Sequence, residues 1–137
     1  MKKVIVILIF IISSNLCSQE MKSFISPDGT QIFYEDIGKG ETIVLLSGGP
    51  GLNSNYLKNL YAVLQNKYRC IILHQRGTGK SLLKEVNKET VNVSRYIEDI
   101  NGLYDELGGN KLTLVGHSWG GMLSFSYAAN QPEKIKK

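Results

Sequence analysis

Apolar residues along this chain follow two alternating patterns. Short runs rich in β-branched residues and leucine predict strands buried on both faces of a sheet. Longer segments with apolar residues three or four positions apart predict amphipathic helices that cross between those strands. The predicted strands are residues 43–46, 71–73 and 111–115, and the predicted helices are residues 55–64, 93–107 and 122–129. This alternation predicts an α/β fold with a doubly wound, mostly parallel sheet.

The segments before the first parallel strand have a different pattern. Residues 22–25 and 31–37 flank the sequence Ser26-Pro27-Asp28-Gly29. In this sequence proline presets one backbone dihedral and glycine supplies a positive one, as a tight turn requires. We therefore expect an N-terminal β-hairpin that joins the sheet.

The first 18 residues have the three parts of a secretory signal peptide. Lys2 and Lys3 precede an apolar run at residues 4–12, and small polar residues follow it. The run is shorter than the roughly 20 residues that span a bilayer, so no stable membrane span is expected after signal cleavage. We expect cleavage after Ser18 and export to the periplasm or the medium.

The two cysteines bear on that assignment. Cys17 offers an alternative in which its sulfur is acylated and the protein is a lipoprotein, but Leu16 before it is larger than the small residue usually found there. If Cys17 leaves with the signal peptide, Cys70 remains alone in an apolar strand pattern. A buried thiol without a disulfide is then expected.

The composition bears on the number of domains and on whether nucleic-acid binding is expected. The chain has 137 residues, with 42% apolar and 20% charged residues, which is typical of one globular domain. The net charge of +4 is spread along the sequence and forms no basic stripe, so nucleic-acid binding is not predicted.

The strongest chemical motif is Gly116-His117-Ser118-Trp119-Gly120, which we call the elbow. It matches G-x-S-x-G between a predicted strand and a predicted helix, where a strained turn would expose the Ser118 hydroxyl as a nucleophile. Gly116 and Gly120 supply the space that such a turn needs. Gly121 is expected to give extra clearance against a neighbouring strand.

A second glycine-rich segment follows the first predicted parallel strand. Gly48-Gly49-Pro50-Gly51 allows backbone N–H groups to approach a ligand closely. We expect the Gly49 N–H, with Gly48 as the alternative, to form an oxyanion hole with the Trp119 N–H. Gly48 and Gly51 would support this loop.

Three motifs in order resemble one family: Gly48-Gly49-Pro50-Gly51, Gln75-Arg76-Gly77-Thr78-Gly79-Lys80-Ser81, and the elbow with Gly121. From about Asp28 onward the chain is similar to proline iminopeptidases and related α/β-hydrolases. The resemblance implies Ser118 as nucleophile and Gly49 and Trp119 as oxyanion hole. It implies small peptide or amide substrates with N-terminal proline. No metal or cofactor is predicted. Ser47 and His74 depart from the family pattern, which has His and Asp there.

The catalytic triad of that family is incomplete here. Its order is Ser, Asp, His, yet no Asp or His follows Ser118. We therefore expect residues 19–137 to be the N-terminal part of an α/β-hydrolase domain, truncated after the elbow helix and nearly inactive alone. His117 is locked beside the nucleophile, and nothing in the sequence suggests a carboxylate to orient His74, so neither is favoured as the base.

Three other interpretations remain at this stage. Residues 77–81 resemble a phosphate-binding P-loop, but His74 stands where the first glycine is required. An esterase or other small-amide hydrolase would use the same elbow on ester or amide substrates. An inactive remnant would keep only the front half of the hydrolase.

Overall fold

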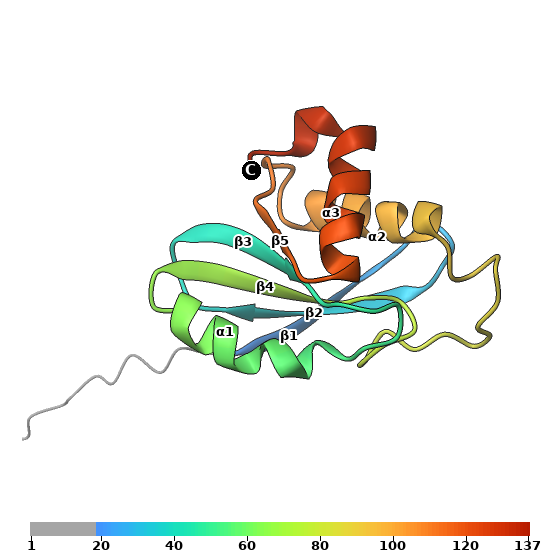
Figure 1. Cartoon of the computed structure of the whole chain (residues 1–137), viewed down its shortest axis with the longest axis horizontal. Coiled ribbons are helices and arrows are strands. Elements are labelled where there is room, and N and C mark those ends of the chain that lie inside the picture. Colours follow the sequence, from blue (N-terminus) through green and yellow to red (C-terminus); the bar gives the residue numbers. More distant parts are fainter. Residues whose placement is uncertain (1–18) are drawn as a thin grey trace, which may run out of the picture.

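The computed structural model describes residues 19–137 as one sheet with helices on both faces (Figure 1). The predicted signal peptide at residues 1–18, with Cys17 and the expected cleavage after Ser18, lies outside the described residues. No helix within residues 19–137 is long and apolar enough to cross a membrane.

The sheet is five-stranded, with the order β1-β2-β4-β3-β5. The strands are β1 (Glu20–Ile25), β2 (Gln31–Ile37), β3 (Glu41–Leu46), β4 (Tyr68–His74) and β5 (Leu114–Gly116). β1 and β2 form the predicted antiparallel hairpin, and β3 runs parallel to both β4 and β5. Because β2 also pairs antiparallel with β4, the sheet is mixed. The predicted α/β fold is confirmed.

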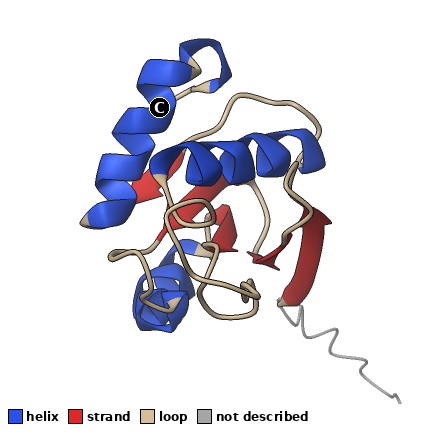
Figure 2. Ribbon diagram, turned by 90° about the vertical axis from the view of Figure 1, so that its right-hand side faces the viewer, coloured by secondary structure: helices blue, strands red, loops and turns tan. Residues whose placement is uncertain are grey.

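Helices cover both faces of this sheet, as Figures 1 and 2 show. They are η1 (Ser54–Leu57), α1 (Lys58–Leu64), α2 (Val93–Glu106), α3 (Trp119–Asn130) and η2 (Pro132–Lys134). α1 packs on one face, whereas α2 and α3 pack on the other. The predicted helix at 55–64 begins as a 3-10 turn, and α3 starts at Trp119 rather than at residue 122.

The alternating side chains of the central strands divide the core into two clusters. In β3, Val44 and Leu46 face α2 and α3, where they join Ile100 and Leu123. Ile43 and Leu45 face the opposite side and pack with α1. Both faces of β3 are therefore apolar and buried, as its uninterrupted run predicts.

The last predicted strand requires a correction. Residues 111–115 were expected to form a buried strand, but β5 begins only at Leu114 and leaves Val115 37% exposed. Upstream of β5, Leu112 forms a parallel bridge with Ile135 and accepts a hydrogen bond from the Lys136 N–H at 2.8 Å. Residues 135–137 therefore pair alongside residues 112–114.

A buried arginine ties the hairpin to α2. Arg76 follows β4, and its guanidinium donates to Asp99 at 2.6 and 2.7 Å and to Asp28 at 2.8 Å. It also donates to the Thr90 carbonyl oxygen at 2.9 Å, while Ser26 donates to Asp99 at 2.6 Å. These paired charges join the β1–β2 turn, α2 and the segment that follows β4.

Asp28 makes part of this network sensitive to acid. Burial acts to raise the pKa of its carboxyl, but hydrogen bonds from Arg76 and Thr30 outweigh burial and lower that pKa to about 2. The charged carboxylate therefore stabilises the fold above about pH 4, and this contribution disappears between about pH 4 and pH 2.

We expect Asp28→Asn to lower the free energy of unfolding near neutral pH by about 2 kcal/mol, because Arg76 loses a charged partner. The fall in stability between pH 4 and pH 2 should become shallower than in the parent. Urea unfolding at several pH values measures both effects, with the exposed Asp105→Asn as control. An unchanged acid profile would contradict this role of Asp28.

Candidate active site

Ser118 lies at the junction of β5 and α3, where the chain reverses direction. Its φ of 52° and ψ of −116° make it the one non-glycine residue within 19–137 with positive φ. Such a backbone costs about 1–3 kcal/mol and persists only where the surrounding structure enforces it. Ser118 is exposed, and no described residue forms a hydrogen bond with its hydroxyl. The structure thus presents a strained, accessible serine.

Two glycines make this reversal sterically possible. A β-carbon on Gly116 would collide with the backbone of Gly120, and one on Gly120 would collide with the Leu46 carbonyl oxygen. The residues at both ends of the elbow must therefore lack side chains. Gly121 differs from the prediction, because its added β-carbon would meet the Gly116 carbonyl oxygen at an ordinary 3.5 Å. Close packing does not require glycine at position 121.

The glycine-rich loop at residues 48–51 lies directly against the elbow. A β-carbon on Gly48 would lie 3.2 Å from the Ser118 β-carbon and 2.9 Å from His117 Nδ1. Gly49 and Gly51 have φ values of 59° and 116°, which explains the need for glycine at both. The sequence prediction that this loop and Ser118 share one site is consistent with this contact.

The backbone N–H groups around Ser118 differ in whether they already donate a hydrogen bond within the protein. The Gly48 N–H donates to the Tyr56 hydroxyl. No hydrogen-bond acceptor in the described part of the chain faces the N–H of Gly49 or of Trp119. Because Ser118 is the N-cap of α3, the Trp119 N–H also lies at the positive end of a helix. The N–H groups of Gly49 and Trp119 therefore have no hydrogen-bond partner among the described residues.

Gln75 links the two segments that carry these donors, which sequence reasoning missed. The Trp119 Nε1–H donates to Gln75 Oε1 at 3.0 Å, and Gln75 Nε2 donates to the Ser47 carbonyl oxygen at 2.8 Å. The Trp119 ring also packs edge-on against Tyr96, with 5.5 Å between centroids. The only signal in the sequence was a glutamine directly after a buried strand, where a polar side chain must find a partner.

Neither histidine of the chain is hydrogen-bonded to Ser118. His117 Nδ1 lies 2.9 Å from the Tyr56 hydroxyl. His74 does have an orienting carboxylate, contrary to expectation, because its Nε2 lies 3.0 Å from the buried Glu35 Oε1. Its Nδ1 accepts from the Lys80 N–H at 3.1 Å, so both ring nitrogens are occupied. His74 therefore stabilises the end of β4.

The pairing of Glu35 with His74 could not be predicted from the sequence, because it depends on the register between β2 and β4. Glu35 pairs with Ile72 across β2 and β4, which places His74 at the diagonal neighbouring position on the same face. Only the antiparallel contact between β2 and β4 brings these residues together. Within residues 19–137, no group of three or more possible metal-ligating side chains occurs.

Comparisons with known proteins cover most of this chain. A model of the α/β-hydrolase fold family matches residues 41–137. A cis-3-alkyl-4-alkyloxetan-2-one decarboxylase from Shewanella oneidensis is 34% identical over 117 residues, which are 85% of this chain and 36% of that protein. A proline iminopeptidase from Lactobacillus helveticus is 33% identical over 113 residues, which are 79% of this chain and 38% of that protein.

Solved structures give the same fold. A proline iminopeptidase-related protein from Thermus thermophilus matches with a TM-score of 0.78 and 24% identity, over 87% of this chain and 42% of that one. An epoxide hydrolase from Vigna radiata matches with a TM-score of 0.74 and 25% identity, over 86% and 38%. The chain thus spans well under half the length of the proteins it resembles.

Proposed function

This chain belongs to the α/β-hydrolase fold family, and from that premise we propose that it carries the nucleophile and the oxyanion hole of a serine hydrolase. The observation that supports this most directly is the strained, exposed Ser118, which precedes the unpaired Trp119 N–H and lies against the loop that carries the unpaired Gly49 N–H. A structural turn has no need of a positive φ at a serine, or of two unused donors next to it.

In the proposed reaction, Ser118 Oγ attacks a substrate carbonyl carbon. The carbonyl oxygen becomes an oxyanion, which accepts hydrogen bonds from the N–H groups of Gly49 and Trp119. Collapse of the tetrahedral intermediate breaks the bond to the amine or alcohol and leaves an ester on Ser118. Water then hydrolyses that ester and regenerates the hydroxyl.

The proton of Ser118 must pass to a base during this attack. His74 is occupied by Glu35 and Lys80, and no hydrogen bond links His117 to the Ser118 hydroxyl. We therefore assign the base to a histidine outside these 137 residues. Loss of a triad member lowers the turnover of a serine hydrolase by about 10⁴- to 10⁶-fold. The 137-residue chain alone, which lacks this histidine, should therefore be close to inactive.

A serine nucleophile favours acyl substrates over epoxides. Attack on a carbonyl gives an ester that water can hydrolyse, whereas ring opening of an epoxide by serine would give a stable ether. The fold shared with epoxide hydrolases is therefore insufficient to assign their reaction to Ser118.

Within acyl transfer, we favour release of N-terminal proline from small peptides. Support comes from the three motifs in order and from relatives that are proline iminopeptidases. The alternative is hydrolysis of an ester or other small amide. Similarity to a decarboxylase that acts on oxetan-2-ones, which are cyclic esters, favours that alternative.

The two substrate classes can be separated with chromogenic substrates. We expect the full-length protein to release nitroaniline from proline 4-nitroanilide at a higher kcat/KM than from the alanine analogue, and to act poorly on 4-nitrophenyl acetate. Acetylated proline anilide is the matched control, since it lacks the free imino group. Efficient ester cleavage with no proline preference would assign the protein to the esterases instead.

A further inference from the structure

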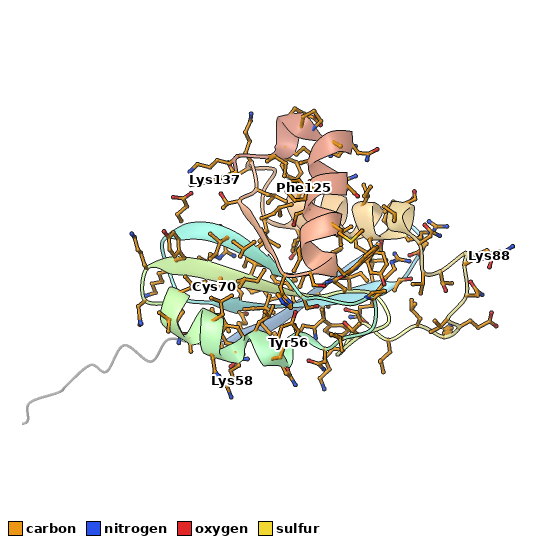
Figure 3. All side chains as sticks on the ribbon, viewed as in Figure 1. Tyr56, Lys58, Cys70, Lys88, Phe125 and Lys137 are labelled. Carbon is orange, nitrogen blue, oxygen red and sulfur yellow. The ribbon has the colours of Figure 1, made fainter. Side chains whose placement is uncertain are left out.

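Tyr56 occupies an unusual place for an exposed aromatic residue. It lies on η1, ahead of α1, and is labelled in Figure 3. Its neighbours Leu57 and Ser54 are buried, and the Asn53 side chain caps the turn by accepting from the Asn55 N–H at 2.8 Å. The backbone around Tyr56 is therefore fixed, although 46% of the residue is exposed.

The Tyr56 hydroxyl joins the two segments of the proposed active site. It accepts from the Gly48 N–H in the glycine-rich loop and lies 2.9 Å from His117 Nδ1 in the elbow. The Tyr56 and His117 rings also meet edge to face, with 5.5 Å between centroids. One side chain from a third segment thus bridges the loop and the elbow beside Ser118.

The Tyr56 hydroxyl can accept one hydrogen bond while it donates another. The phenol oxygen accepts from Gly48, so the phenol proton is free to be donated to His117 Nδ1. If the hydroxyl donates to Nδ1, the neutral His117 ring carries its proton on Nε2. In this arrangement the lone pair of Nδ1 accepts the Tyr56 O–H hydrogen bond, so it is not available as a base for Ser118.

We propose that Tyr56 is a positioning residue for the oxyanion hole. Its hydroxyl engages the Gly48 N–H, so the Gly49 N–H is the donor of this loop that has no partner among the described residues. It also fixes the distance between that donor and the Trp119 N–H across the elbow. This inference rests on the proposed serine hydrolase function.

The position of Tyr56 separates it from Gln75, which also links the loop to the elbow. Gln75 is 1% exposed, so its replacement would leave buried polar groups unpaired and would disturb folding. Tyr56 is half exposed, so water can bond to the Gly48 N–H and to His117 Nδ1 when the hydroxyl is absent. Neither group is then left unpaired, but the direct link between loop and elbow is lost. Loss of that hydroxyl should therefore alter the geometry of the donors while the fold remains intact.

The test is Tyr56→Phe in the full-length protein, which keeps the ring and removes only the hydroxyl. We expect kcat to fall by about 10- to 100-fold with little change in KM, since a misplaced donor weakens transition-state binding more than substrate binding. The thermal midpoint should stay close to that of the parent. Tyr104→Phe is the matched control, because no described residue is hydrogen-bonded to the Tyr104 hydroxyl.

A spectroscopic measurement on the same variants tests the bridge itself. Nitrogen-15 NMR of the His117 ring should show the proton on Nε2 in the parent and a mixture of tautomers in Tyr56→Phe. The Tyr104→Phe spectrum should match the parent. A structural role for Tyr56 without the hydrogen bond would leave the His117 signals unchanged.

The outcomes keep this inference separate from the proposed function. Equal kcat values for the parent and Tyr56→Phe, in a protein whose turnover depends on Ser118, would overturn the role of Tyr56 alone. A parent without Ser118-dependent turnover would overturn the proposed function, and the role of Tyr56 with it. A lower kcat together with altered His117 tautomers supports both.

Discussion

Replacement of Ser118 by alanine is expected to lower the turnover of the full-length protein by about 10⁴- to 10⁶-fold. The variant keeps the Gly49 and Trp119 N–H donors but has no hydroxyl to form the acyl intermediate. Labelling by a fluorophosphonate, which forms a covalent bond with an activated serine, should disappear at the same time. Turnover assays and mass spectrometry of the labelled protein measure the two effects.

Ser124 provides the matched control for this experiment. It lies on α3, the same helix that follows Ser118, and its hydroxyl donates to the Gly120 carbonyl oxygen at 2.8 Å. Ser124→Ala should therefore keep both turnover and labelling. Equal labelling of the parent and Ser118→Ala would exclude Ser118 as the nucleophile.

Replacement of Gly120 by alanine is expected to destabilise the fold by about 3 kcal/mol or more. The new methyl group would meet the carbonyl oxygens of Leu46 and Ser47, which are backbone atoms of β3 and its extension and cannot rotate away. Either α3 or the end of β3 must move to accommodate it. Urea unfolding of the parent and the variant gives the difference in free energy.

Gly121→Ala is the contrasting variant at the next position. Its methyl group would make only ordinary contact with the Gly116 carbonyl oxygen. Because alanine is the better helix former, we expect a gain of about 0.5–1 kcal/mol within α3. Similar unfolding curves for Gly120→Ala and Gly121→Ala would show that close backbone packing does not determine the choice of glycine in the elbow.

Features that depend on neighbouring residues were predictable from the sequence. The turn at Ser26-Pro27-Asp28-Gly29 lies between strands with the expected pairing, and β2 has the predicted bounds. The elbow also lies between a strand and a helix. Its five residues can make this tight turn because Gly116 and Gly120 have no side chains that would collide with the backbone. In both cases the determining contacts are local.

Features that depend on distant residues could not be predicted. The carboxylate partners of Arg76 lie 23 and 48 positions away, and the partners of the Tyr56 hydroxyl lie 8 and 61 positions away. Strand order decides such contacts, and the apolar pattern does not specify strand order.

The backbone of Ser118 also limits how far this protein can be stabilised. Glycine adopts positive φ without the steric cost that serine bears, so Ser118→Gly would relieve about 1 kcal/mol of strain. A library selected only for heat resistance would therefore favour glycine at this position and lose the proposed nucleophile. Selection for thermal stability in this protein must be paired with a screen for turnover, because the two favour different residues at one site.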